Sequence, residues 1–349
     1  MTLARTSMTS PDRPAPVLAT SDLEVAYELG PRQKLRAVDR VSFEVARGET
    51  LALVGESGCG KSSVAKAVMQ LAPMTGGSIR IEGQSVAQLD AAALKRMRQR
   101  FQMIFQDPIS SLNPKRTVRE ILEFPLRVNG LFEKTASGQR IREALEIVGL
   151  DSQSVLDRYP HEFSGGQCQR ISIARSLILD PVLLVCDEPV SALDVSVRAQ
   201  VLNLLNSLRE RLGLSMLFIS HDLAVVRNVA DRVAVMFLGA ICETGDAQDV
   251  LGQPAHPYTA ALLSAVPRTD PGLQPPRIAL RGEMPSPMAP PSGCRFHTRC
   301  PGAKEACASS APSLRRLSDG REVACHFPFS IAVSQPRATA SIEPREITV

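Results

Sequence analysis

Gly55-Glu56-Ser57-Gly58-Cys59-Gly60-Lys61-Ser62 lies between an apolar run at 51–54 and a helix-like run at 63–69. It fits G-x-x-x-x-G-K-[ST], the pattern of a phosphate-binding loop that joins a strand to a helix. Its three glycines let backbone N–H groups turn towards a triphosphate without a clash at Cβ. The helix N-terminus, the Lys61 ammonium and the Ser62 hydroxyl suit the phosphates and Mg²⁺. The stretch therefore predicts nucleotide binding in an α/β domain.

Bulk properties limit what the rest of the chain can be. Its 349 residues suffice for one large core and one or two smaller domains. The net charge of +4, with 22% charged residues, gives no argument for a nucleic-acid partner. No window reaches the roughly 18 consecutive apolar residues of a membrane span, and residues 1–19 lack the apolar block of a signal peptide. We expect a cytoplasmic protein with disordered tails at 1–19 and 331–349.

Apolar patterning predicts two kinds of sheet. Residues 23–29 and 41–45 alternate like half-buried strands, which predicts a small antiparallel sheet ahead of the loop. Tyr27, in the first of them, suits either the core or a platform for a purine ring. Residues 182–186 are a continuous apolar run typical of a central parallel strand, and 215–219 predict another.

Polar side chains follow these two predicted parallel strands. Asp187 and Glu188 come directly after the first, and His221 comes soon after the second. Because α/β sheets bind ligands at the carboxyl ends of their strands, we expect all three beside the phosphate loop. Adjacent carboxylates are costly unless a cation lies near them. With a magnesium nucleotide, they divide into a metal-side acid and a water-activating base.

A second candidate anion site is Ser164-Gly165-Gly166-Gln167, which opens a helix predicted over 169–179. Ser164 has the chemistry of an N-cap, and two glycines leave the helix mouth uncovered. Upstream, residues 109–163 show helical apolar spacing and no evident strand. These observations predict a helical insert within the α/β domain.

Four of the eight cysteines crowd into 294–325, after a proline-rich linker at 271–291. Their spacing is Cys294-x5-Cys300-x6-Cys307-x17-Cys325, wider than the usual zinc-ribbon pairs and unlike either ferredoxin pattern. The absence of an export signal argues against disulfides. His297 and His326 keep a zinc site possible, so spacing alone leaves the metal open. The other four cysteines are expected to be small buried hydrophobic residues or tolerated loop residues.

Taken in order, the phosphate loop, Gln106, Ser164–Gln167, Asp187-Glu188, the turn Ser191–Asp194 and His221 resemble the ATP-binding subunit of an ABC transporter over about residues 22–265. The segment departs slightly from the family's signature, because Phe163, directly before Ser164, occupies a position where leucine is commonest. The resemblance implies an α/β fold: a P-loop NTPase (RecA-like) core with an antiparallel β subdomain and a helical subdomain at about 109–180. The implied domains are the cassette at 20–265 and a small cysteine-rich C-terminal extension at 266–330.

The resemblance also implies site residues. Glu188 would orient the attacking water, His221 would contact the γ-phosphate, and Gln106 would sense the magnesium nucleotide and face the membrane partner. Mg²⁺ would be held by Ser62, Gln106 and Asp187. ATP would be bound by Tyr27, which would stack on adenine, and by Gly55, Glu56, Ser57, Gly58, Cys59, Gly60, Lys61, Ser62, Ser63, Ser164, Gly165, Gly166, Gln167 and Asp194. Of these, Ser164, Gly165, Gly166 and Asp194 would act across a dimer interface.

Further stretches indicate which transporter group is meant. Phe105–Pro108, Ser111–Pro114, His256–Thr259 and the cysteine-bearing tail resemble the oligopeptide/dipeptide/nickel import group. Residues 36–39 and 159–162 are similar to the second ATPase of such systems. The resemblance implies peptide import, with nickel or another solute as the alternative. A soluble ABC protein acting on ribosomes or DNA is the alternative of another class, but the chain has one cassette, no coiled coil and no basic stripe.

The same resemblance implies cofactors, partners and location. ATP and Mg²⁺ would act with a second, homologous ATPase subunit, two transmembrane permease subunits and an extracytoplasmic solute-binding protein, and no nucleic acid. The protein would lie peripherally on the cytoplasmic face of the inner membrane. Similar tails carry a [4Fe–4S] cluster, here on Cys294, Cys300, Cys307 and Cys325, which would staple a small region that lacks a sufficient core.

Overall fold

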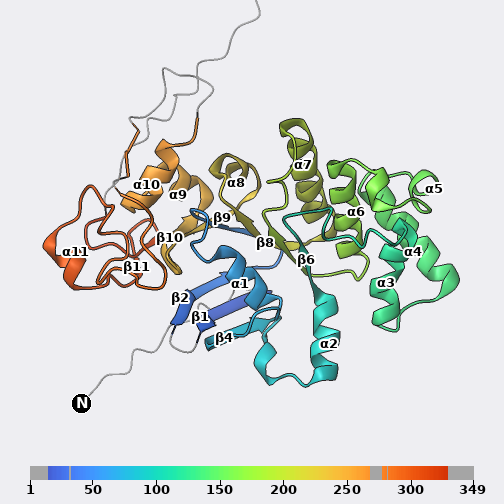
Figure 1. Ribbon diagram of the computed structural model, residues 1–349, viewed down its shortest axis with the longest axis horizontal. Coiled ribbons are helices and arrows are strands. Elements are labelled where there is room, and N and C mark those ends of the chain that lie inside the picture. Colours follow the sequence, from blue (N-terminus) through green and yellow to red (C-terminus); the bar gives the residue numbers. More distant parts are fainter. Residues whose placement is uncertain (1–14, 31–32, 268–276, 281, 329–349) are drawn as a thin grey trace, which may run out of the picture.

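The structure is a computed structural model that describes residues 15–30, 33–267, 277–280 and 282–328. Figure 1 shows a central sheet with a helical subdomain at one end and the C-terminal extension at the other. A second, smaller sheet packs below helix α1 (Lys61–Val68), which lies between the two sheets. Most of the expected tails, 1–14 and 331–349, falls outside the described residues.

The central sheet has eight strands in the order β11-β12-β10-β9-β3-β8-β7-β6. Strands β6, β7, β8, β3 and β9 pair in parallel, and β10 pairs antiparallel with β9. The bounds are β3 Thr50–Val54, β6 Phe101–Ile104, β7 Leu183–Asp187, β8 Ser215–Ser220, β9 Arg232–Phe237 and β10 Ala240–Asp246. This arrangement confirms the α/β fold that the sequence predicts.

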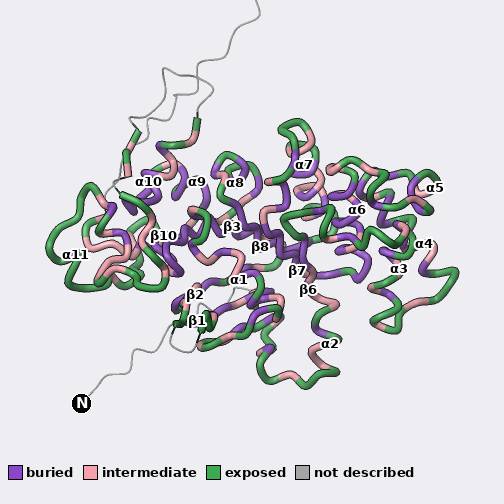
Figure 2. Tube along the Cα trace, in the orientation of Figure 1, coloured by how far each residue is buried: buried purple, intermediate pink, exposed green. Residues whose placement is uncertain are grey.

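Strand β3 shows why these runs are apolar throughout. Leu51 and Leu53 pack in the core between the two sheets, whereas Ala52 and Val54 pack on the opposite face. Successive side chains of a strand point to opposite faces, so a sheet covered on both sides needs apolar residues at every position. Figure 2 shows the buried central strands running across the molecule. The phosphate loop begins directly after β3.

The smaller sheet is antiparallel, with strands in the order β2-β1-β4-β5, as predicted. Its bounds are β1 Leu18–Gly30, β2 Gln33–Val45, β4 Gly76–Ile81 and β5 Gln84–Ser85, followed by a short 3₁₀ turn Val86–Gln88 and helix α2 Ala91–Arg100. The expected tail at 1–19 extends too far, because Val17 and Leu18 are buried in this sheet's core. Leu18 is the first residue of β1 and pairs with both Val45 and Ile81.

A helical subdomain follows β6, as predicted. It comprises α3 Val118–Val128, α4 Lys134–Ile147, α5 Ser152–Val155, the 3₁₀ turn Pro160–Glu162 and α6 Gly165–Leu177. Helices α7 Val195–Leu212, α8 Leu223–Val229, α9 Ala247–Gly252 and α10 Pro257–Ser264 complete the domain. Among the helices in the described residues, none combines the length and apolar character that crossing a bilayer requires.

The C-terminal extension is built onto the central sheet. Strand β12 (Glu322–Val323) pairs antiparallel with β10, and β11 (Arg315–Arg316) pairs with β12. Between Cys294 and these strands lies one short helix, α11 (Glu305–Ser309). Phe296 is 2% exposed and packs with residues of β9 and α10. The extension therefore shares a core with the cassette.

Leu217 of β8 offers a test of the central core, because it is fully buried between the two sheets. Replacing it by alanine (Leu217→Ala) should lower the free energy of unfolding by about 2–5 kcal/mol, the cost of a buried leucine cavity. Chemical denaturation measures this change. The matched control is Leu71→Ala at a leucine that is 61% exposed, where the loss should stay below about 0.5 kcal/mol. Equal losses at the two sites would contradict the described packing.

Candidate active site

The phosphate loop adopts a backbone conformation that requires its glycines. Gly58 and Gly60 have φ values of +79° and +107°, in the left-handed region that other residues rarely adopt. A Cβ on Gly60 would also lie 2.1 Å from the Ala37 carbonyl oxygen. Gly60 precedes α1, and no side chain caps the N–H groups of this helix. Those N–H groups are therefore available to an anion.

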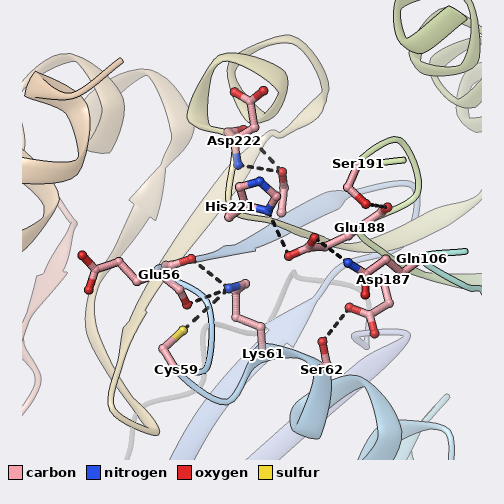
Figure 3. Close-up of polar contacts among 12 residues, drawn as sticks. Glu56, Cys59, Lys61, Ser62, Gln106, Asp187, Glu188, Ser191, His221 and Asp222 are labelled. Atoms are coloured by element: carbon pink, nitrogen blue, oxygen red, sulfur yellow. Dashed lines mark hydrogen bonds and ion pairs between the residues drawn. The ribbon is translucent and has the colours of Figure 1, made fainter. Parts of the chain in front are cut away.

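Lys61 is 4% exposed and directs its ammonium back across the loop (Figure 3). Its Nζ donates to the Gly55 and Glu56 carbonyl oxygens at 2.8 and 3.0 Å and lies 3.8 Å from Cys59 Sγ. The Glu56 N–H donates to the Tyr258 hydroxyl, so this amide is already used. Cys59 is buried, and its pKa is raised by burial. The loop thus holds one buried cation in place at its centre.

Ser62 and Asp187 form the second part of the site. The Ser62 hydroxyl donates to Asp187 Oδ1 at 3.0 Å, which joins the start of α1 to the carboxyl end of β7. Burial raises the pKa of Asp187; the Ser62 hydrogen bond opposes the rise, and the Glu188 charge adds to it. A divalent cation at this hydroxyl and carboxylate would offset the cost of the buried charge. This donor set fits Mg²⁺, which binds one or two protein oxygens together with phosphate oxygens.

Glu188 lies at the centre of the third part, with two polar partners (Figure 3). Gln106 Nε2 donates to Glu188 Oε2 at 3.1 Å, and His221 Nδ1 lies 3.1 Å from Glu188 Oε1. These residues follow β6, β7 and β8, three adjacent strands. Glu188 has a φ of +48°, and its N–H donates to the Ile219 carbonyl oxygen. Strained backbone of this kind persists only where the surroundings fix it.

A pocket of about 740 Å³ joins these parts, within the range typical of small-molecule sites. Tyr27 lines it, packs against the core and contacts Ser63 Oγ through its hydroxyl, and its role as a purine platform stays a prediction. The sequence-predicted residues that line the pocket are Tyr27, Gly55, Glu56, Ser57, Gly58, Gly60, Lys61, Ser62, Ser63, Gln106, Glu188 and His221. Leu35, Ala37, Leu262 and Pro287 also line it, and no sequence signal identified them.

The Ser164–Gln167 segment is a helix N-terminus, as predicted. Ser164 caps α6 and forms a reciprocal capping box with Gln167, at 3.3 and 3.0 Å. A Cβ on Gly166 would lie 2.4 Å from Val197 Cγ1 of α7, which explains a glycine there. Ser164, Gly165, Gly166 and Gln167 are not among the described residues that line the pocket, and neither is Asp194, which is exposed at the start of α7. Within one chain they lie apart from the phosphate loop.

The four C-terminal cysteines line one small cavity of about 40 Å³, together with His256, His297 and His326. Burial raises the pKa of Cys294, Cys300 and Cys325, the last to about 11. Within the described residues, no three His, Cys, Asp or Glu side chains are arranged as a metal-binding group. The other cysteines, Cys59, Cys168, Cys186 and Cys242, are all buried, as expected.

Comparison with known proteins agrees with this geometry. The family described as ABC transporter matches residues 38–191, and the oligopeptide/dipeptide transporter C-terminal region matches residues 242–307. A putative peptide import ATP-binding protein of Brucella ovis is 51% identical over 310 residues, which cover 89% of this chain and 97% of that protein. The dipeptide transport ATP-binding protein DppF of Haemophilus influenzae is 48% identical, with coverages of 84% and 89%.

Among solved structures, the ATP-binding cassette MJ0796, in a dimeric post-hydrolysis state bound to ADP and phosphate, matches with a TM-score of 0.60 and 27% identity. The match covers 66% of this chain and 98% of that one. The phosphate loop, the Ser62–Asp187 pair and the Glu188 cluster are thus set in the fold of a known nucleotide-binding protein. The chain belongs to the ABC transporter family, among the ATP-hydrolysing, ATP-binding proteins of the oligopeptide/dipeptide import group.

Proposed function

We propose that this chain powers the import of peptides, acting through a transmembrane pair that other chains supply. The observation that carries the ATPase part is the convergence of Gln106, Glu188 and His221 at the pocket that also contains Lys61 and Ser62. Peptide as the cargo is supported by the relatives from Brucella ovis and Haemophilus influenzae, whose names state peptide import and dipeptide transport.

Each side chain has a role that its position supports. The Lys61 ammonium and the N–H groups at the start of α1 bind the β- and γ-phosphates. Ser62 and Asp187 hold Mg²⁺, with Asp187 acting through water, and Gln106 senses the bound metal nucleotide. Mg²⁺, when bound, neutralises charge that develops on the phosphates. Glu188 orients the attacking water, and His221, which lies against its carboxylate, contacts the γ-phosphate.

The active unit is a head-to-tail dimer. Ser164 and the two glycines at the mouth of α6 form an anion site outside the pocket of their own chain. They complete the pocket of a second, homologous ATPase subunit, with Asp194 beside them, and receive the same help in return. The dimeric state of the MJ0796 cassette supports this arrangement. Hydrolysis removes the bridging charge, and the dimer opens.

The remaining partners follow from the cargo. A peptide importer of this type needs two permease subunits and an extracytoplasmic binding protein, which together select the solute. The exposed Gln106 segment, with Phe105 and Ile109 exposed beside it, faces the permeases. The chain then lies peripherally on the cytoplasmic face of the inner membrane.

The four-cysteine cavity holds a metal centre, and a [4Fe–4S] cluster is the first choice. His297 Nδ1 lies 2.9 Å from the Cys294 carbonyl oxygen, and His326 Nε2 lies 2.9 Å from that of Ser310. A histidine that donates one ring N–H to a carbonyl oxygen keeps its other ring nitrogen free to ligate a metal, so the choice of a four-thiol cluster rests on the resemblance to tails that carry one.

Lys61→Ala tests the pocket. Loss of the buried cation should weaken ATP binding by about 100-fold, the scale of losing charged hydrogen bonds. Equilibrium binding of a fluorescent ATP analogue measures the change. The control is Lys95→Ala on α2, at an exposed lysine, which should bind like the unmodified protein. Unchanged affinity in Lys61→Ala would remove the phosphate-loop assignment.

Glu188→Gln separates binding from hydrolysis. This variant should bind ATP, hydrolyse it at least about 100-fold more slowly, and accumulate as a closed dimer with its ATPase partner, because the water-orienting carboxylate is missing. Phosphate release and size-exclusion chromatography with ATP measure the two effects. Glu210→Gln, at an exposed glutamate on α7, is the matched control. Normal turnover in Glu188→Gln would exclude Glu188 as the base.

Anaerobic purification tests the metal centre through iron, sulfide and zinc content. We expect about four iron and four sulfide per chain, in keeping with a four-thiolate cluster. Cys300→Ser should lose this content, and Cys168→Ala, at a buried cysteine in α6, should keep it. Zinc without iron would overturn the cluster, and absence of any metal would overturn the site.

A further inference from the structure

The phosphate-loop residue Glu56 is held by a side chain from the C-terminal extension. Arg299 Nη1 donates to Glu56 Oε2 at 2.7 Å, and Arg299 Nη2 donates to Oε1 at 3.3 Å. This is a bidentate pair, the strongest geometry for an arginine and a carboxylate. Figure 3 shows the Glu56 carboxylate turned away from Lys61. The loop's one acidic side chain, Glu56, therefore points towards Arg299, which lies 243 positions further along the chain.

Arg299 cannot readily give up this partner. It is 8% exposed, and its guanidinium carbon lies 5.9 Å from the centre of the Phe237 ring. A buried charge that loses its only carboxylate partner costs several kcal/mol. Among the ion pairs of the described residues, Glu56 is the one carboxylate paired with Arg299. The pair is thus fixed from the side of the extension.

The backbone of Glu56 is held from the same direction. Its N–H donates to the hydroxyl of Tyr258 at 2.9 Å. The Tyr258 ring packs 5.3 Å from that of Phe296, three residues before Arg299. Nearby, Arg295 donates to Asp39 of β2 and to the Leu238 carbonyl oxygen. Arg295 and Arg299, beside Cys294 and Cys300, therefore bind the phosphate loop, strand β2 and the residue that follows β9.

We propose that Arg299 is a positioning residue for nucleotide binding, which orients and neutralises Glu56 so that a triphosphate meets no free carboxylate in the loop. Without Arg299, Glu56 would be an unpaired anion beside the β- and γ-phosphates, and would repel them. The proposal rests on ATP binding at the phosphate loop. It predicts that the defect comes from the Glu56 charge, so removing that charge should remove the defect.

The test uses the full chain and equilibrium binding of a fluorescent ATP analogue. Arg299→Gln should weaken binding about tenfold, the effect of about 1.4 kcal/mol. Adding Glu56→Gln to it should bring binding back to within about threefold of the unmodified protein, because the amide leaves no charge to repel the phosphates. The ATP affinity of Arg299→Lys should lie between those of Arg299→Gln and the double variant. Because it keeps the positive charge, this variant also serves as the test if Arg299→Gln does not fold. Arg315→Gln, at an exposed arginine of the same extension, should bind normally.

Three results would overturn the proposal. They are normal ATP binding by Arg299→Gln, an equal defect in the double variant, and an Arg299→Lys variant that binds no better than Arg299→Gln. A merely structural arginine would give the second result, since the double variant would remain as destabilised as the single one. Lys61→Ala separates the failure of this proposal from the failure of the proposed function. If Lys61→Ala weakens ATP binding by about 100-fold and Arg299→Gln does not weaken it, nucleotide binding at the loop stands and only the role of Arg299 fails.

Discussion

The site depends on one constraint, the parallel pairing of β3 with β8, β8 with β7, and β7 with β6. Parallel strands bring their carboxyl ends to the same edge of a sheet. The phosphate loop follows β3, Asp187 ends β7 with Glu188 directly after it, His221 follows β8, and Gln106 follows β6. Four segments that are far apart in the sequence therefore meet within hydrogen-bonding distance. The apolar runs that build the strands also bury both faces of the sheet, which holds these ends in register.

Most of this arrangement could be predicted from the sequence, because it comes from local rules. Continuous apolar runs mark buried parallel strands, and the residue after each run is placed by the fold. The capping box of Ser164 and Gln167 is likewise local, since both partners lie within one helical turn. The predicted boundary of the N-terminal tail is wrong because it depends on pairing with strands that are distant in the sequence. Leu18 lies in an apolar run of only five residues, 15–19, and is buried because β2 and β4 pair on either side of it.

The parts that sequence reasoning missed are tertiary contacts between distant segments. Arg299 reaches Glu56 because the extension packs against β9 and α10, and no periodicity in 294–325 indicates that contact. Tyr258 reaches Glu56 from α10 itself. Leu262 and Pro287 line the nucleotide pocket for the same reason. The four cysteines could be grouped by spacing, and they do line one cavity. Spacing could not supply their side-chain directions, and no three His, Cys, Asp or Glu side chains of the described residues are arranged as a metal-binding group.

These contacts change how the extension is understood. Strand β12 extends the central sheet, Phe296 shares the core behind β9, and Arg295 and Arg299 reach β2 and the phosphate loop. Each arginine directly adjoins a cysteine of the small cavity, Cys294 or Cys300. Whatever fixes those cysteines therefore also fixes the two cations that grip the cassette. Two distant parts of the chain therefore shape the phosphate loop. Its own glycines set the backbone conformation, and the extension holds its one carboxylate, Glu56, through Arg299.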